Sequence, residues 1–357
     1  MSNIDYSLLN KESLIELRQA ALDDYIIDLD WSPDGTKLAV VTVEGAVFLF
    51  DNYGDTANCK LIGQHSGGGN SVSWRSDGVE FATAGHDGQA KVWDGFSGQE
   101  IVSLPAGDSW VAKVTYNPSS NCLATAAGKQ LKLWNQEREA FYESSDHSST
   151  IADIGWNPLG SGIAVAAYNG VTLHVPGKQK KPRKYICKGS SLVLAWSPDA
   201  KYIATGEQDS TVHFWHRASG EEARMCGFPT KVLELSWDST GQWLATGGSS
   251  SVILWDCSGK GPADRKPREY VEHSNKLIQL AFQPNGKLLA SAGNDAVLAL
   301  WNPMTDDKVI ERKSLSSPAS CLRWNKKGEL AIGQKDGKVI ILGINEEVNG
   351  EGRFDIN

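Results

Sequence analysis

The segment that decides the fold is NSVSWRSDGVEFATAGHDGQAKVWD, residues 70–94. It begins with alternating apolar and polar residues that end at an aromatic residue, Trp74. A turn rich in Ser, Asp and Gly follows, then an apolar stretch with small residues (EFATAG), a second turn, and a stretch that ends at Trp93. Period-two alternation is typical of a half-buried strand, and these turn residues favour tight reversals. The segment therefore predicts a small antiparallel sheet.

The same order of features recurs along the chain. Eight copies of the aromatic residue that ends the first strand occur, at Trp31, Trp74, Tyr116, Trp156, Trp196, Trp237, Phe282 and Trp324. Their successive spacings are 43, 42, 40, 40, 41, 45 and 42 residues, and a nearly constant period indicates a repeat architecture. A four-stranded sheet cannot bury both of its faces alone, whereas radial repetition covers them. We therefore expect one β-propeller, because two packed sandwiches would not produce eight in-phase copies.

The units resemble WD40 repeats, and the resemblance extends from about Leu14 to Ile344. The family's structural tetrad is a His before the first strand, Ser or Thr in the second, Asp in the next turn and Trp in the third. The resemblance implies that the Asp holds the His, the hydroxyl bridges and the indole N–H donates, so that no buried polar group is unpaired. Two units match completely, one with His65, Thr83, Asp87 and Trp93, the other with His273, Ser291, Asp295 and Trp301. The third unit lacks the His and the Asp, and the fourth and eighth lack the Trp.

The number of blades depends on how the ring closes. The stretch LIELRQ (14–19) precedes the first unit and alternates like a strand, whereas no fourth strand is evident after KVIILGI (338–344). Family propellers often close by pairing an N-terminal strand with the last three strands. We therefore expect an all-β, WD40-type propeller of eight four-stranded blades over residues 14–344, with seven blades as the alternative. Residues 1–13 and 345–357 are expected to be tails, the second of them acidic.

Composition and charge favour a soluble cytoplasmic protein. The net charge of −8 does not favour DNA or anionic membranes, although a local patch could still bind them. No apolar run approaches the roughly 18–20 residues that span a bilayer, and residues 1–22 show no secretory signal. The six Cys are scattered without a C-x-x-C pair, and Cys187 and Cys226 fall at corresponding positions of neighbouring units. We expect free thiols in a reducing compartment.

No catalytic motif stands out. Gly67–Gly69 precedes a strand rather than a helix and is interpreted as a flexible turn, and CSGKG (257–261) lacks the spacing and the Ser/Thr of a P-loop. His65 and His273 are assigned to the tetrads, and His147 is expected to have a similar role. We expect no enzyme activity, no metal and no cofactor. Metal handling or catalysis at the channel mouth is kept as an alternative.

The resemblance implies that the loops before each first strand and after each second strand share one face, where WD40 proteins commonly bind partner proteins. Trp110 is the most informative residue there, since it follows a polar stretch (107–109) and has no repeat-defined core position. Trp and Tyr are enriched at interface hot spots, although Trp110 could instead fill a gap between blades. The favoured function is a non-enzymatic scaffold for a protein or peptide partner. Its candidate contact residues are Trp110, Tyr25, Tyr168, Lys231, Asn275 and His86.

Two basic loops are expected on the opposite face. They comprise Lys178, Lys180, Lys181, Arg183 and Lys184 in the fourth unit, and Lys260, Arg265, Lys266 and Arg268 in the sixth. Together they would form a positive rim on an acidic protein and attract RNA, phosphates or an acidic partner. Nucleic-acid or polyanion binding is therefore the alternative function, and two solvated loops are the simpler interpretation.

Overall fold

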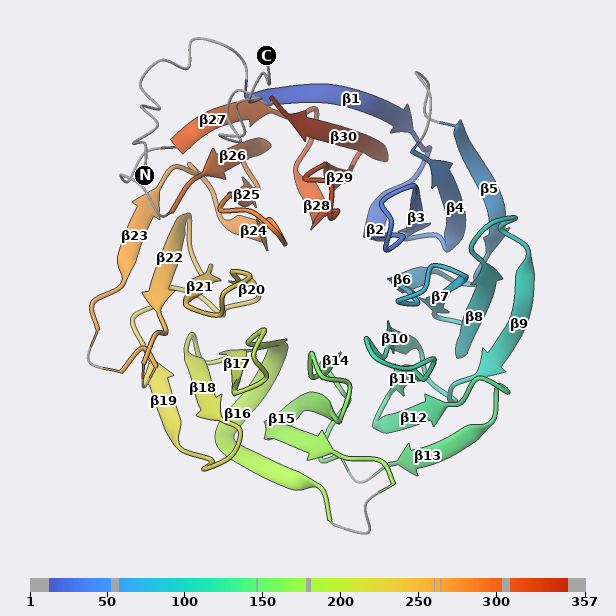
Figure 1. Cartoon of the computed structure of the whole chain (residues 1–357), viewed down its shortest axis with the longest axis horizontal. Helices are drawn as coiled ribbons and strands as arrows, with labels where there is room; N and C mark the ends of the chain where they lie inside the picture. Colours follow the sequence, from blue (N-terminus) through green and yellow to red (C-terminus); the bar gives the residue numbers. More distant parts are fainter. Residues whose placement is uncertain are drawn as a thin grey trace, which may run out of the picture.

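The computed structural model describes residues 13–52, 58–145, 147–177, 181–259, 261–263, 265–303 and 309–345. These residues form thirty strands and no helix. The strands are arranged radially around a central axis, with each unit's first strand innermost and its last strand at the rim (Figure 1). The prediction of a single all-β propeller is confirmed.

Each unit contributes strands in the order in which the sequence repeats them. The first three units are β2 (Ile26–Trp31), β3 (Lys37–Thr42), β4 (Ala46–Asp51) and β5 (Asn58–Gln64); β6 (Gly69–Trp74), β7 (Glu80–Gly85), β8 (Gln89–Asp94) and β9 (Glu100–Pro105); and β10 (Val111–Tyr116), β11 (Leu123–Ala127), β12 (Gln130–Trp134) and β13 (Ala140–Ser144). The fourth and fifth units comprise β14 (Asp153–Trp156), β15 (Ile163–His174), β16 (Arg183–Trp196), β17 (Tyr202–Glu207), β18 (Val212–His216) and β19 (Glu222–Met225). The last three are β20 (Leu235–Trp237), β21 (Trp243–Thr246), β22 (Ser251–Asp256) and β23 (Arg268–Val271); β24 (Leu277–Phe282), β25 (Leu289–Gly293), β26 (Val297–Trp301) and β27 (Val309–Ser314); and β28 (Ala319–Trp324), β29 (Leu330–Gln334) and β30 (Lys338–Ile344), which β1 (Leu14–Ala21) completes.

The eight sequence units form seven hydrogen-bonded sheets in the described residues. Six sheets have four strands, and the seventh has six, in the order β14-β15-β16-β17-β18-β19. Its strand β15 pairs with β14 through residues 163–166 and with β16 through residues 168–173. Strand β16 then pairs with β17 through residues 191–196. The expectation of eight separate four-stranded blades is therefore corrected, because the fourth and fifth units share one sheet.

Strand β15 reverses direction within its own length. A straight strand of twelve residues would be roughly 40 Å long, yet its last residue, His174, lies against Gly162, which precedes its first. The reversal occurs at Asn169 and Gly170, whose φ angles are 71° and 104°. Positive φ at two successive residues is the geometry of a tight hairpin turn. Each half of β15 thus serves as one strand of the fourth unit.

The ring closes through the N-terminal strand, as the sequence predicted. Strand β1 pairs antiparallel with β30 along its length, from Leu14–Ile344 to Ala21–Lys338. The carboxylate of Glu311, in the outer strand of the seventh unit, accepts hydrogen bonds from the amides of Ser13 (2.5 Å) and Leu14 (2.8 Å). Residues 13–21 are therefore fixed both to the eighth unit and to the seventh.

Neighbouring units are joined by the aromatic residue that ends each first strand. The indole N–H of Trp74 donates to the carbonyl of Asp30 at 2.9 Å, and Asp30 immediately precedes the equivalent aromatic residue of the previous unit. All six Trp at this position make the corresponding bond: Trp31 to Arg323, Trp74 to Asp30, Trp156 to Thr115, Trp196 to Gly155, Trp237 to Ala195 and Trp324 to Ala281. The bond from Trp31 to Arg323 (3.0 Å) connects the first unit to the eighth.

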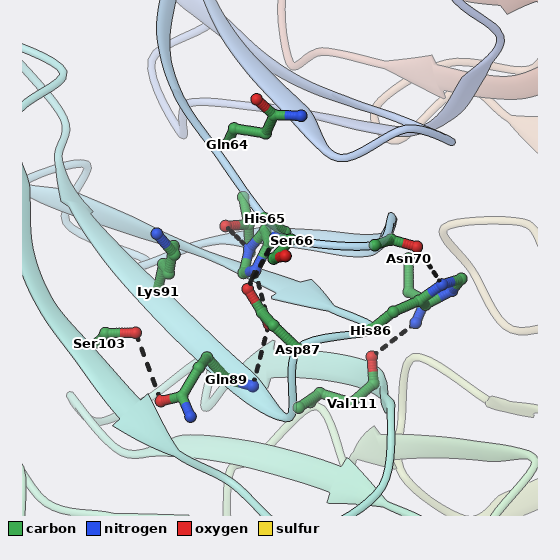
Figure 2. A network of polar contacts seen from close by, with 12 residues as sticks. Gln64, His65, Ser66, Asn70, His86, Asp87, Gln89, Lys91, Ser103 and Val111 are labelled. Atoms are coloured by element: carbon green, nitrogen blue, oxygen red, sulfur yellow. Dashed lines mark hydrogen bonds and ion pairs between the residues drawn. The ribbon is translucent and has the colours of Figure 1, made fainter.

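The two complete tetrads have the geometry that the resemblance implied. His65 contacts Asp87 through Nδ1 at 3.1 Å (Figure 2). Its Nε2 lies 2.8 Å from the hydroxyl of Thr83, and the indole of Trp93 donates to the same hydroxyl at 2.8 Å. In the seventh unit the equivalent distances are 3.2, 2.9 and 2.8 Å. Burial lowers the pKa of His65, against the opposing effect of Asp87.

The fourth unit replaces the tetrad with a different polar chain, which corrects the expectation for His147. The second-strand position that holds Thr83 in the second unit is occupied by Val165, which has no hydroxyl for an indole. The side chain of His174, 1% exposed, takes the place of the Trp. His147 donates through Nδ1 to the carbonyl of Lys129 (2.9 Å), leaving Nε2 to accept from His174 (3.1 Å). The Tyr142 hydroxyl then donates to Nδ1 of His174 at 2.8 Å, so the chain is complete when both rings are neutral.

Removing one indole N–H at a junction should weaken the ring. In Trp324→Phe the carbonyl of Ala281 loses its donor, and we expect a loss of about 1–2 kcal/mol in the free energy of unfolding. The seventh unit carries Phe282 at this position, so the fold accepts the ring itself. Urea unfolding measures the change, with Trp110→Phe at an exposed indole as the control, expected to stay within about 0.5 kcal/mol. Equal losses in the two variants would contradict the proposed role of the bond.

Truncating a tetrad indole should be more costly. Trp301 is 2% exposed and packs in the core between the sixth and seventh units. We expect Trp301→Ala to reduce the free energy of unfolding by about 3–5 kcal/mol, since a large side chain is removed from a close-packed core. A loss below about 1 kcal/mol in denaturant unfolding would show that this indole contributes little.

The stability of the fourth unit should depend on pH. Burial, followed by the charges of His147 and Lys184, lowers the pKa of His174 to about 4. Above the unfolded value of 6.5 both states are neutral, and below it the unfolded chain binds a proton that the folded protein does not. Stability should therefore fall between pH 6.5 and 4, by about 2–3 kcal/mol from this group. The free energy of unfolding, measured at several pH values across this range, should change less with pH in His174→Phe than in the wild type. An equal pH dependence in the two proteins would disprove the assignment.

Candidate protein-interaction face

The hairpin connections place two sets of loops on the same side of the ring. Because consecutive strands are antiparallel, each first strand begins on the side where each second strand ends. We call this side the upper face and the opposite side the lower face. Trp110 immediately precedes β10 and His86 immediately follows β7, so both lie on the upper face.

Trp110 and His86 form a stacked pair across the junction between the second and third units. Their ring centroids are 4.0 Å apart and their planes differ by 10°. The side chain of Trp110 is 63% exposed. This exposure excludes the alternative in which Trp110 fills a gap between blades. The pair instead presents one face of an indole to solvent and has the other covered by an imidazole.

Hydrogen bonds fix the imidazole beneath the indole. Nδ1 of His86 lies 2.8 Å from the carbonyl of Gly67, and Nε2 lies 3.0 Å from Oδ1 of Asn70 (Figure 2). The amide nitrogen of Asn70 donates to the carbonyl of Val111 at 2.9 Å, which orients Oδ1 toward His86. Both ring nitrogens thus lie within hydrogen-bonding distance of an acceptor oxygen. These contacts hold the exposed indole in a defined position before any partner arrives.

Sequence reasoning missed the role of the turn glycines. A Cβ on Gly68 would lie 2.7 Å from Nδ1 of His86 and 2.8 Å from the carbonyl of Val43, and Gly68 has a φ of 132°. The interpretation of Gly67–Gly69 as a merely flexible turn is therefore corrected, since this turn lets His86 approach the backbone closely. Three successive glycines immediately before the first strand of the second unit were the available signal.

The other four candidate residues lie apart from the stacked pair. Tyr25 begins the first unit and is half-buried, and burial raises its pKa. Tyr168, 49% exposed, stands at the turn of β15 in the fourth unit. Lys231 and Asn275 are exposed on the loops that precede β20 and β24. The upper face thus has one preformed aromatic pair and several isolated exposed side chains.

Several residues of the two basic loops make contacts within the protein. Lys178, Lys180 and Lys260 lie outside the described residues. The three arginines have structural contacts: Arg183 donates to the carbonyls of Arg217 and Ala218 (both 2.8 Å), Arg265 pairs with Asp256, and Arg268 donates to the carbonyl of Pro303 and lies 4.9 Å from the ring of Trp243. Lys181, Lys184 and Lys266 are exposed. Fewer cations are therefore available to a polyanion than the sequence suggested.

Charged residues on the inner strands also have structural partners. Asp28 accepts from the amide of Val72 (3.2 Å) and lies 3.3 Å from Arg323, while Asp153 accepts from the amide of Leu194 at 3.0 Å. Burial raises the pKa of Asp30 to about 6, and this carboxylate accepts the amide of Trp74 at 2.9 Å. These carboxylates therefore accept backbone amides of the neighbouring unit's first strand, across the junctions between units.

The described part of the chain shows no cluster of three or more His, Cys, Asp or Glu side chains that could hold a metal ion. All six cysteines are free. Burial raises the pKa of five of their thiols to about 12: Cys59, Cys122, Cys187, Cys257 and Cys321. No helix in the described residues is long and apolar enough to cross a membrane.

The chain is similar to several proteins of known type. It is 25% identical over 331 residues to "Cell division cycle 20.5, cofactor of APC complex" of Arabidopsis thaliana, covering 85% of this chain and 71% of that protein. It is also 25% identical over 282 residues to "Pre-mRNA-processing factor 19 homolog 2" of the same plant, covering 74% and 52%.

Solved structures show the same fold. The WD40 β-propeller domain of Doa1 superposes with a TM-score of 0.64 at 15% identity, over 93% of this chain and 98% of that one. The computationally designed Ika8 protein superposes with a TM-score of 0.78 at 18% identity, over 92% and 99%.

Family models extend over most of the ring. Residues 25–266 match the model of the IFT122 first β-propeller, and residues 265–302 match that of the WD domain, G-beta repeat. With the recurrent junctions and tetrads described above, these matches establish that the chain belongs to the WD40-repeat β-propeller family.

Proposed function

We propose that this propeller is a non-catalytic scaffold that binds a protein or peptide partner on its upper face, with Trp110 as the central contact. The observation that carries the proposal is the stacked pair, because an exposed indole is held in place without a partner. A rigid aromatic contact loses little conformational freedom on binding, and Trp is enriched among residues that dominate interface energies. The propeller relatives include a cofactor of a complex and a processing factor, which fits a role in assemblies.

The proposed scaffold has no catalytic or metal-handling role and lies in the cytoplasm. Inner-strand carboxylates are engaged in junctions and three of the six cysteines are buried, which supports a role without catalysis or metal handling. Six free cysteines fit the reducing cytoplasm, where we place the protein. Polyanion binding through the basic loops is the less favoured candidate, since the three described arginines already have partners within the fold.

Affinity purification with and without the indole tests the scaffold. Tagged wild type and Trp110→Ala are compared in nuclease-treated extract of cells that naturally express the protein. We expect a discrete protein partner that the variant binds at least about tenfold more weakly, because hot-spot residues each contribute about 2 kcal/mol or more. Both proteins should unfold at the same denaturant concentration, since the indole is exposed.

Phe96→Ala is the matched control. Phe96 is 86% exposed but lies on the turn between β8 and β9, at the lower face. Equal loss of the partner in both variants would disprove a specific role for the upper face. Loss of the partner on nuclease treatment, with affinity that falls steeply with added salt, would favour the polyanion candidate instead.

A further inference from the structure

A cavity lies at the rim of the fourth unit, away from the Trp110–His86 pair. It has a volume of about 320 Å³. Three segments line it: residues 147–148, which lead into the unit, residues 167–172 around the turn of β15, and residues 184–188 in the first half of β16. Its volume is at the lower end of the range for ligand pockets and suffices for one or two side chains.

The cavity is open to solvent, and two exposed apolar side chains line it. Ile186 is 70% exposed and Tyr168 is 49% exposed. Ile186 pairs with Gly170 in the ladder between β15 and β16, which places it beside the turn that carries Tyr168. Gly170 has no room for a side chain, because an added Cβ would lie 2.1 Å from the carbonyl of Tyr185. The fold therefore leaves an apolar recess that no described side chain fills.

Two lysines flank the recess. Lys184, Ile186 and Lys188 alternate along one strand and so project from the same side of it. Neither lysine forms an ion pair with any carboxylate in the described residues, and both line the cavity. His147 also lines it, and its ring nitrogens contact the carbonyl of Lys129 and Nε2 of His174. The described lining thus has two cations and no anion.

The alternation of lysine and isoleucine distinguishes this outer strand from the others. Four further outer strands expose a single large apolar residue: Leu61, Ile101, Phe141 and Val271. None of these has a lysine two residues away on both sides. Phe141 has the opposite arrangement, with Glu139 and Glu143 in the flanking positions.

We propose that this cavity binds an extended acidic peptide of a partner protein, with one apolar side chain in the recess and a carboxylate two residues away on each side. In an extended chain the outer residues of such a pattern are roughly 13 Å apart, which matches the spacing of Lys184 and Lys188 along β16. Each carboxylate meets one ammonium group, and the apolar side chain covers Ile186 and Tyr168. The site is separate from the upper-face contact at Trp110 and does not depend on it.

The test uses a peptide of known sequence and the methyl signal of Ile186. A nonapeptide with the central sequence Glu-Ser-Leu-Ser-Glu is titrated into protein labelled at its isoleucine methyl groups. We expect a saturable shift of the Ile186 signal, and a tenfold or greater loss of affinity in the double variant Lys184→Glu/Lys188→Glu. Lys266→Glu, at an exposed lysine elsewhere, and Trp110→Ala should bind as the wild type does.

Control ligands distinguish an acidic peptide with an apolar residue from other possible occupants of the cavity. A peptide with Ser in place of Leu should bind much more weakly, and equal binding would reduce the site to a general anion site. Competition by millimolar inorganic phosphate or by single-stranded RNA, or the absence of any shift at millimolar peptide, would overturn the proposal. Concentration-dependent association of the protein that Phe141→Ser abolishes would assign the recess to residues 139–143 of a second copy, and would also overturn it.

Discussion

The fold depends on a hydrogen bond from an indole of one unit to a backbone carbonyl of the previous one. Each sheet would expose two apolar faces if it stood alone, and the ring covers them only if neighbouring sheets keep a fixed stagger. In six units a Trp at the end of the first strand sets this stagger, because its ring packs in the junction while its N–H reaches the carbonyl before the preceding aromatic residue. The same position in the third unit is Tyr116, whose hydroxyl donates to Glu80 of the second unit at 2.7 Å. Different side chains thus make the same kind of connection.

The upper-face contact is built on one of these junctions. His86 belongs to the second unit and Trp110 to the third, and Asn70 joins the two through its bonds to His86 and Val111. The exposed indole therefore keeps its place only while the two units keep their stagger. A change in the junction beneath would move the contact surface without altering any exposed residue. This coupling explains why a repeat fold can present a site that no single repeat contains.

The sequence predicted the parts of the structure that repeat. The period of about 42 residues follows from residues in recurring positions, and the resemblance to WD40 repeats implied the closing strand at 14–19 and the two complete tetrads. The structure shows each of them. The shared sheet of the fourth and fifth units was not predictable in this way, since it depends on a two-residue reversal at Asn169–Gly170 and on a strand that continues through Gly189. The stack of His86 on Trp110 joins residues 24 positions apart, and the described residues show no equivalent stack in another unit.

The departures from the repeat and the candidate sites occur in the same places. The fourth unit has lost its tetrad hydroxyl and its indole, has His147 and His174 in their place, and contains the tight turn that exposes Tyr168 beside the recess. A longer turn at 169–170 would change the wall of the cavity that carries Tyr168. The second unit keeps its tetrad intact and varies only in the loop that carries Gly67–Gly69. Variation in a loop thus produces a contact on the upper face, whereas variation within the strands produces a recess at the rim.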